Sequence, residues 1–319
     1  MLPSVYGPVP HRDGFAVGVD LVGPPRRCDM DCVYCPYSDV SCSHHVKSLE
    51  DVMRELELFS GLLERRIISW IIIRGAGEQT LCPFLGEFLH DIRKRLGDRV
   101  SISLLTNGIG LMRKSLNKLH FLEELDEVVF RLDAGSQKVF NAINRPQVGV
   151  SYSSLVNFIK RLRDVVEELC LEVTLLRSLG ISNTSSWELR RLIETVSSIA
   201  PSRVKLTTPI WRLPNGWKPL TRGEIMEIYR IMADILGWKR LDFDRPRSRG
   251  RISLQTHDMR TALLSILARR PSTKDELLIM FDINPEELQN TLCDLMNEGL
   301  IVQEGEAYRL RRCEIEDSS

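Results

Sequence analysis

Three cysteines lie within eight residues of the chain, in the stretch Cys28-Asp-Met-Asp-Cys32-Val-Tyr-Cys35. The spacing C-x3-C-x2-C places three soft thiolate ligands in one tight loop, and iron–sulfur clusters require such ligands. Three thiolates can hold three irons of a cubane 4Fe–4S cluster and leave the fourth iron open to a small chelating molecule. The spacing therefore predicts a metal centre held by Cys28, Cys32 and Cys35.

A structural zinc site is the alternative that this loop leaves open. Zinc in such sites takes four ligands, and His44, His45 or Cys42 could supply the fourth. The other cysteines are scattered and form no second ligand set: Cys42, Cys82, Cys170, Cys293 and Cys313. In a chain of this size without a secretory signal, we do not expect a disulfide framework.

The elements that must position the cysteine loop alternate between strands and helices. Strands are predicted at residues 15–22, 67–73, 100–106, 127–132, 171–176 and 204–209, and helices near 48–64, 83–96, 111–124, 136–143, 152–168, 184–199 and 221–236. Repetition of this kind over about 240 residues indicates a parallel sheet with helical crossovers. Polar residues or glycines follow the strands, at the edge where parallel barrels carry out their chemistry. We therefore predict an α/β fold, a partial (βα)6 TIM-like barrel, over residues 1–244.

The last quarter of the chain has a different pattern. Residues 245–255 read as a basic linker with Arg245, Arg247, Arg249 and Arg251, and they could equally contact phosphates or act as a solvated hinge. Residues 256–319 predict three helices and a two-stranded wing, a small winged helix-turn-helix domain. Its expected recognition helix carries Glu286, Glu287, Asp294 and Glu298 without Lys or Arg, which suits a phosphate-lined groove poorly.

Composition excludes several classes of protein. The 319 residues are 43% hydrophobic and 27% charged, so the chain is neither fibrous nor wholly disordered. Its 43 basic and 43 acidic residues give a formal net charge of +0, so binding to a nucleic acid would need a local basic patch. No apolar run reaches the length of a membrane span and no secretory signal is apparent, so we expect a cytoplasmic protein without a membrane partner.

The cysteine motif, with Tyr34 before its last cysteine, resembles the radical S-adenosylmethionine (SAM) superfamily. The longer stretch VYGPVP…GVDLVGPPRRCDMDCVYC resembles its Fe–S oxidoreductases, the branch related to wyosine-forming tRNA enzymes and the molybdenum-cofactor cyclase. Some of these proteins also end in a winged helix. The wyosine-forming enzymes carry extra cluster cysteines ahead of the main triplet, and this chain has none before Cys28.

The resemblance implies an iron–sulfur enzyme, an oxidoreductase or transferase, with one 4Fe–4S cluster and SAM as cofactors. The reduced cluster would cleave SAM to methionine and a 5′-deoxyadenosyl radical, which would abstract hydrogen from a substrate that is an RNA base, a peptide or a metabolite. An electron donor such as ferredoxin or flavodoxin would reduce the cluster, and an RNA or a protein could be the substrate partner. The rival reading is a zinc-binding winged-helix regulatory or binding protein without radical chemistry.

The resemblance also implies which residues contact SAM. Gly75-Ala76-Gly77-Glu78 follows the second predicted strand, where the family holds the methionine amino group with its glycine-rich motif. Gly75 and Gly77 permit close approach of the backbone, and Glu78 can accept hydrogen bonds from an ammonium. The family usually has proline after this glutamate, and this chain has Gln79.

Other predicted cofactor contacts follow later strands. Thr106 and Asn107 end the third strand and Asp133 ends the fourth, where these side chains could bond ribose hydroxyls or the substrate, or simply form turns. Arg177 could pair with the methionine carboxylate. Weaker candidates are Pro209 and Ile210 beside the adenine, and Asp20, which could reach the interior or close the first strand with a hydrogen bond.

Overall fold

The structure is a computed structural model that describes residues 3–11, 14–23, 27–37, 47–114, 119–243, 259–281 and 283–311. Contacts within it divide the chain into two compact units. The first unit consists of Met1–Arg27, Pro36–Ile102 and Pro246–Ser319. The second unit consists of Cys28–Cys35 and Ser103–Arg245. The cysteine loop therefore falls in the second unit and the glycine-rich stretch in the first.

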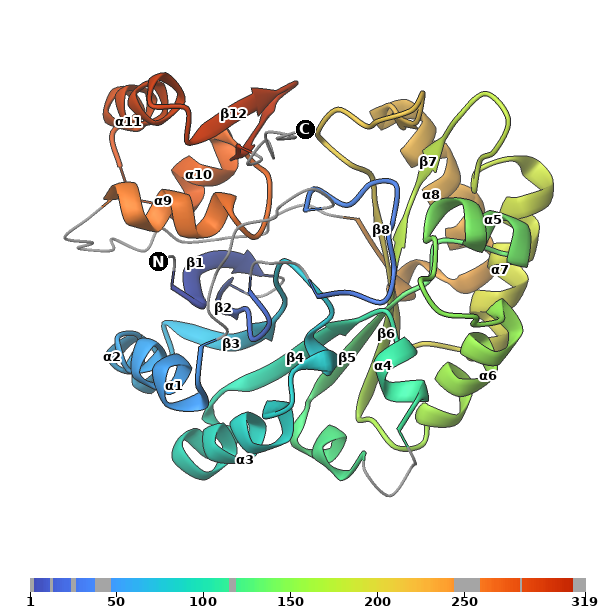
Figure 1. The fold of residues 1–319 in the computed structure, drawn as a ribbon. Coiled ribbons are helices and arrows are strands. Elements are labelled where there is room, and N and C mark those ends of the chain that lie inside the picture. The colour runs from blue at the N-terminus through green and yellow to red at the C-terminus, as the bar shows by residue number, and fades with distance from the viewer. Residues whose placement is uncertain are drawn as a thin grey trace, which may run out of the picture. The chain divides into compact units, whose positions relative to one another are not determined.

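The first unit contains three paired strands and the helices that follow them (Figure 1). Its elements before the boundary are β1 (Val5–His11), β2 (Gly14–Val19), α1 (Leu49–Glu57), α2 (Ser60–Glu64), β3 (Ile68–Ile73), η1 (Gln79–Leu81), α3 (Leu85–Leu96) and η2 (Gly97–Arg99). Strand β2 runs parallel to β3, with Val19 opposite Ile73, and antiparallel to β1. This register brings the residues after β2 and after β3 to the same edge of the first unit.

The C-terminal segment, residues 259–311, belongs to the first unit. It contains α9 (Met259–Leu267), β11 (Ser272–Thr273), α10 (Lys274–Met280), α11 (Pro285–Asn297), β12 (Ile301–Glu304) and β13 (Ala307–Leu310). Its strands form an antiparallel sheet in the order β11-β13-β12. Three helices and a hairpin are present as expected, while the assignment to the winged-helix family stays a prediction.

The C-terminal segment shares one hydrophobic core with β1, β2 and β3. Tyr6, Val9 and Trp70 are buried together with Leu263 and Leu292 of this segment. Helices α9 and α10 pack against β1 (Figure 1). Burial of apolar area stabilises a fold by about 25 cal/mol per Å2. This shared core therefore stabilises the packing of residues 259–311 on β1, β2 and β3.

The second unit carries a run of parallel strands. Its elements are β4 (Ser101–Thr106, which begins in the first unit), α4 (Ile109–Met112), η4 (His120–Glu124), β5 (Glu127–Arg131), α5 (Gln137–Ile143), α6 (Tyr152–Leu162), β6 (Glu168–Thr174), β7 (Leu176–Arg177), α7 (Ser186–Ile199), β8 (Arg203–Thr207), β9 (Lys218–Pro219), α8 (Arg222–Leu236), η5 (Trp238–Arg240) and β10 (Leu241–Phe243). Strands β4, β5, β6, β8 and β10 pair in that order, each parallel to the next. Helices α5, α6 and α7 lie along these strands (Figure 1).

The predicted alternation of strand and helix is therefore confirmed, with a few differences of extent. The helix expected over 111–124 is instead the short α4 and η4, and residues 115–118 lie outside the described part of the chain. Strand β1 was not expected, because Pro8 and Pro10 weaken a strand pattern; its register with β2 shifts between Tyr6 and Val9, where a bulge tolerates proline. None of the described helices is both long and apolar enough to cross a bilayer.

The predicted boundaries at 1–244, 245–255 and 256–319 stay predictions. Residues 244–258 lie outside the described part of the chain. The basic linker with Arg245, Arg247, Arg249 and Arg251 therefore has no structural account here.

Candidate functional site

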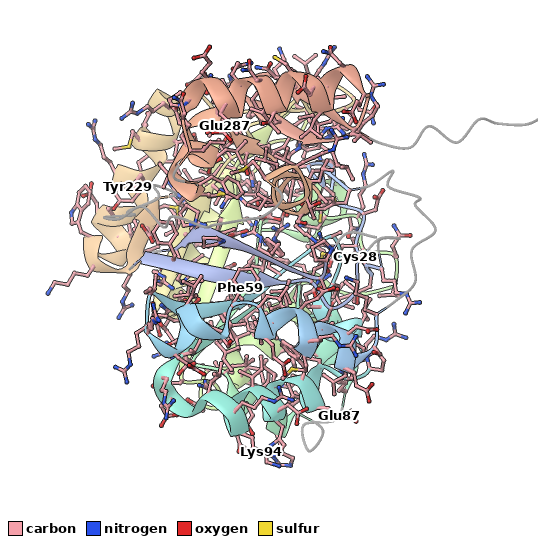
Figure 2. All side chains as sticks on the ribbon, turned by 90° about the vertical axis from the view of Figure 1, so that its left-hand side faces the viewer. Cys28, Phe59, Glu87, Lys94, Tyr229 and Glu287 are labelled. Carbon is pink, nitrogen blue, oxygen red and sulfur yellow. The ribbon has the colours of Figure 1, made fainter. Side chains whose placement is uncertain are left out.

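The cysteine loop is held by its own backbone on the end of α5. The N–H of Val33 donates to the carbonyl of Ile143 at 2.9 Å, and the N–H of Asp31 donates to the carbonyl of Arg145 at 3.0 Å. The N–H of Gln147 donates in turn to the carbonyl of Asp29 at 2.8 Å. The loop that begins at Cys28 (labelled in Figure 2) is thus paired with residues 143–147 of the same unit. Since the terminal carbonyls of a helix lack helical partners, α5 supplies ready acceptors for this pairing.

Two asparagine amides face the sulfurs of the cysteine loop. Nδ2 of Asn107 lies 3.8 Å from Sγ of Cys28, and Nδ2 of Asn144 lies 3.6 Å from Sγ of Cys32. Hydrogen bonds to cysteine sulfur stabilise the negative thiolate and tune the potential of iron–sulfur clusters. The donors around this loop therefore fit thiolate ligands.

A buried carboxylate organises these amides. Oδ2 of Asp133, which follows β5, accepts hydrogen bonds from the hydroxyl of Tyr34 at 2.5 Å and from Nδ2 of Asn144 at 2.6 Å. Its Oδ1 accepts the N–H of Thr174, at the end of β6, at 2.7 Å. Burial raises the pKa of Asp133, and burial followed by the nearby Asp133 raises the pKa of Tyr34. Tyr34 and Asp133 were expected to contact SAM; here they join the cysteine loop to the ends of β5 and β6.

The burial of Cys32 affects the protonation of its thiol, which decides how the residue can bind a metal. Cys32 is 9% exposed, and burial together with the carboxylate of Asp133 raises the pKa of its thiol to about 12. A thiol in these surroundings becomes a thiolate when a cation binds it, because coordination to a metal deprotonates a thiol. Cys28 and Cys35 are partly exposed, so the loop has an open side. The three cysteines, with amide donors at the sulfurs of Cys28 and Cys32, therefore fit an iron–sulfur cluster.

In the first unit, the glycine-rich stretch is arranged around another buried carboxylate, that of Asp20 after β2. Oδ2 of Asp20 accepts the N–H of Ala76 at 3.1 Å, and its Oδ1 accepts the N–H of Gly23 at 3.0 Å and Nε2 of Gln79 at 3.2 Å. Asp20 has no exposed surface. Both interpretations of Asp20 are therefore compatible with the structure. Its side chain is buried in the interior, and its hydrogen bond from Gly23 closes the end of β2.

Both glycines of this stretch occupy places where a side chain cannot fit. A Cβ on Gly75 would lie 2.0 Å from Cγ of Asp20, and a Cβ on Gly77 would lie 2.3 Å from the carbonyl oxygen of Arg27. The N–H of Glu78 donates to that same carbonyl at 2.8 Å. Glycine is therefore required here by the close approach of Asp20 and Arg27. The predicted close approach of this backbone to SAM stays a prediction.

Gln79 has a role that the sequence did not suggest. Its side chain is fully buried, accepts the N–H of Leu21 at 2.8 Å and donates to Asp20 and to the carbonyl of Gly77. It ties the glycine-rich stretch to the end of β2 and does so at the position where the family usually has proline. The adjacent Glu78 is buried, and its Oε1 accepts the hydroxyl of Thr80 at 2.7 Å.

The remaining candidates are scattered. Thr106 accepts the N–H of Gly108 at 3.0 Å and so holds a local turn. Asn107 does the same by accepting the N–H of Ile109 at 2.9 Å, and its Nδ2 also reaches the cysteine loop by donating to Asp29 at 2.7 Å. Arg177 is exposed and forms an ion pair with Glu224. After β8, Pro209 is buried and Ile210 is 39% exposed. The predicted roles of these residues in cofactor binding stay predictions.

The extra cysteines differ in their surroundings. Cys82 is buried in the first unit and closes η1, while Cys42 lies outside the described residues, as do His44, His45 and Cys313. Cys170 lies within 4.8 Å of carboxylate oxygens of Glu127 and Glu168, at the starts of β5 and β6. Arg203 forms an ion pair with Glu127 there, so a side-chain cation already balances this group. In parallel barrels that end of the strands serves stability.

Comparisons with known proteins agree with this picture. The family model described as "Radical SAM superfamily" matches residues 22–196, more than half of the chain. A UPF0026 protein of Synechocystis is 29% identical over 216 residues, covering 65% of this chain and 76% of that protein. A protein named "GTPase Obg" from Brachyspira hyodysenteriae is 27% identical over 311 residues. That match covers 94% of this chain and 43% of that protein, so this chain spans less than half of that relative's length.

Solved structures identify the fold. A radical SAM methyltransferase from Sphaerobacter thermophilus superposes with a TM-score of 0.57 at 13% identity, covering 75% of this chain and 68% of the other. SuiB of Streptococcus suis, bound to its precursor peptide, gives a TM-score of 0.55 at 13% identity, covering 71% of this chain and 48% of SuiB. The predicted α/β fold of the partial TIM-like type is confirmed by this likeness. The zinc-binding alternative gains no support from these comparisons.

Proposed function

The chain belongs to the radical SAM superfamily, and from this premise we propose that Cys28, Cys32 and Cys35 hold one 4Fe–4S cluster that binds SAM. Family membership supports an enzyme of the radical SAM reaction type. When bound, the cluster would supply the single electron that cleaves SAM to methionine and a 5′-deoxyadenosyl radical, which takes a hydrogen atom from the substrate. The residues described here bind, orient and shield these groups.

One observation carries the proposal: the cysteine loop is built around its sulfurs. Two amide groups face Cys28 and Cys32, and the carboxylate of Asp133 fixes one of them, Asn144. A loop that merely closed a turn would need no polar side chains directed at sulfur. In metal sites, residues that do not touch the metal orient its ligands through hydrogen bonds of this kind.

We assign the methionine end of SAM to the glycine-rich stretch. Gly75 and Gly77 let the stretch pack closely on Asp20 and Arg27, and Glu78 offers a carboxylate to an ammonium group. The buried Glu78 is already held by Thr80, so it is oriented before a ligand arrives. Pre-orientation lowers the entropic cost of binding.

The partners remain part of the proposal. A one-electron donor such as ferredoxin or flavodoxin would reduce the cluster, in a cytoplasmic setting. The substrate class is that predicted from the resemblance: an RNA base, a peptide or a metabolite. Whether SAM is consumed or regenerated depends on that substrate.

The experiment is anaerobic reconstitution of the full chain with iron and sulfide. We expect a brown protein with about four irons per chain that forms 5′-deoxyadenosine from SAM when a chemical reductant is added. The matched control is the Cys32→Ala variant treated in the same way. A colourless wild-type protein that retains one zinc would contradict the proposal and restore the rival reading.

A further inference from the structure

The glycine-rich stretch is tied to a residue almost two hundred positions further along the chain. Arg269, just after α9 in the C-terminal segment, donates from Nε to Oδ2 of Asp20 at 3.3 Å. The same carboxylate oxygen accepts the N–H of Ala76. Arg269 is 3% exposed and Asp20 is 0% exposed, so water does not screen this pair.

A second contact reaches the residue directly before the stretch. The guanidinium carbon of Arg269 lies 5.7 Å from the ring centroid of Tyr6, a cation–π distance. The hydroxyl of Tyr6 donates to the carbonyl of Arg74 at 2.9 Å, directly before Gly75. Gly18 leaves the room for this ring, since a Cβ there would lie 2.2 Å from the Tyr6 side chain.

The guanidinium is fixed from its own side as well. Its NH1 group donates to the carbonyl of Ser265 in α9 at 3.2 Å. The helix that carries it shares the buried core with β1, through residues such as Leu263 and Ile266. Arg269 therefore reaches Asp20 from a packed element and with a defined direction.

We propose that Arg269 is a positioning residue for SAM binding: through Asp20 and Tyr6 it fixes the backbone of residues 74–76 and makes the C-terminal segment part of the cofactor site. The role in SAM binding rests on the proposed function, whereas the role in ordering the stretch does not. The two anchored residues, Arg74 and Ala76, flank Gly75, where the sequence offers no side chain to restrict the backbone. Without the guanidinium, Asp20 loses its charged partner and Tyr6 loses the cation beside its ring, so both anchors are weakened at once.

The test compares the full-length Arg269→Met variant with the wild type in two measurements. Hydrogen exchange of a peptide covering residues 74–79 in cluster-free protein reports the order of the stretch. The dissociation constant of SAM for the reconstituted protein, by equilibrium dialysis, reports binding. We expect faster exchange, and a dissociation constant raised by at least about tenfold, as for loss of one partner from a buried charge pair. At saturating SAM, the rate of 5′-deoxyadenosine formation should stay close to that of the wild type.

Matched variants separate positioning from general loss of stability. Arg270→Met removes the neighbouring arginine, which pairs with Glu276, and should leave both measurements unchanged. Leu292→Ala creates a cavity in the core of the C-terminal segment and lowers its stability, yet retains Arg269 and should bind SAM nearly as the wild type does. Arg269→Lys keeps the charge and should restore part of the affinity.

The double variant Asp20→Asn with Arg269→Met keeps the test valid if Arg269→Met fails to fold. It removes both charges of the buried pair, which proteins usually tolerate, and SAM binding should still be weak. Unchanged exchange at residues 74–79 and a SAM dissociation constant within twofold of the wild type, in either variant, would overturn the proposal. If wild-type protein binds no SAM, the proposed function fails, while the exchange measurement still supports or refutes the anchoring by Arg269.

Discussion

The two loops assigned to cofactors are fixed in different ways, although each surrounds a fully buried aspartate that follows a strand. Asp133 follows β5 and receives the hydroxyl of Tyr34 and the amide of Asn144. Asp20 follows β2 and receives the N–H of Ala76 and the guanidinium of Arg269. Toward the loop that it fixes, the first carboxylate thus holds a side chain, that of Tyr34, whereas the second holds a backbone N–H, that of Ala76.

The difference follows from what each loop must present. The cysteine loop presents side chains, so its backbone is free to pair with residues 143–147 and its sulfurs receive amide donors. The glycine-rich stretch presents bare backbone, so its conformation must be set from outside, by Gln79 and by the distant Arg269. Both loops therefore depend on residues far away in the sequence, and they differ in what those residues hold: sulfurs and the Tyr34 side chain in one loop, backbone groups in the other.

Loss of a cysteine should have the largest effect. Cys32→Ala removes one ligand, so bound iron and 5′-deoxyadenosine formation should fall further than the about 100-fold that loss of an outer partner of a metal site costs. The melting temperature should change little, because the loop keeps its backbone pairing. Cys293→Ala, on α11, is the matched control and should retain iron. Continued formation of 5′-deoxyadenosine by Cys32→Ala would show that Cys32 is not a ligand of the cluster.

A side chain on Gly75 should be the next most damaging change. In Gly75→Ala the new Cβ would meet Asp20 at 2.0 Å, and relief of such a clash costs about 1–3 kcal/mol of stability. We expect weaker SAM binding by roughly tenfold or more, measured by equilibrium dialysis. In Gly149→Ala no atom lies within 4 Å of the added Cβ, so this control should bind normally. Normal binding by Gly75→Ala would show that close packing against Asp20 is dispensable.

The amide of Asn144 should raise the reduction potential of the cluster. Asn144→Ala removes a donor to Cys32, so the cluster should become harder to reduce. A hydrogen bond worth about 1 kcal/mol corresponds to a negative shift on the order of 40 mV for one electron. Anaerobic redox titration followed by electron paramagnetic resonance measures it, with Asn141→Ala on the exposed side of α5 as control. An unchanged potential would mean that the amide only holds Asp133.

The smallest effect is expected outside both loops, at the start of α8. Thr221 caps this helix in a reciprocal pair with Glu224, and Thr221→Ala should cost about 1 kcal/mol of stability in urea unfolding without changing SAM binding. Hydrogen bonds from the backbone and side chain of Thr221 lower the pKa of Glu224. That carboxylate therefore stabilises the fold above the pKa of an unfolded glutamate, and the contribution is lost as pH falls through the lower folded value. The difference in the free energy of unfolding between the wild type and Thr221→Ala should therefore become smaller as pH falls from about 5 to about 3.

Local pattern was enough to predict the cysteine loop and most of the elements around it. Residue spacing identified Cys28, Cys32 and Cys35, and continuous apolar runs identified strands such as β3. Gly75 and Gly77 were identified from the resemblance, and the structure supplies the physical reason in their close approach to Asp20 and Arg27.

The anchors of both loops could not be predicted from local pattern. Asn144 is an ordinary helix-ending residue in the sequence, Gln79 stands where the family has proline, and Arg269 follows a helix assigned to another domain. Their roles depend on which elements meet after folding. The one available signal was polarity in an apolar setting: Arg269 follows the run ALLSILA, and a buried arginine needs a charged partner.

The central claim is that one iron of the bound cluster is left without a protein ligand so that SAM can occupy it. The most direct measurement is the electron paramagnetic resonance spectrum of the reduced, anaerobically reconstituted protein before and after addition of SAM. We predict the signal of a single 4Fe–4S cluster whose shape changes when SAM is added, and no such cluster in Cys32→Ala. A spectrum that SAM leaves unchanged, or a centre whose every metal position is filled by side chains, would contradict the account.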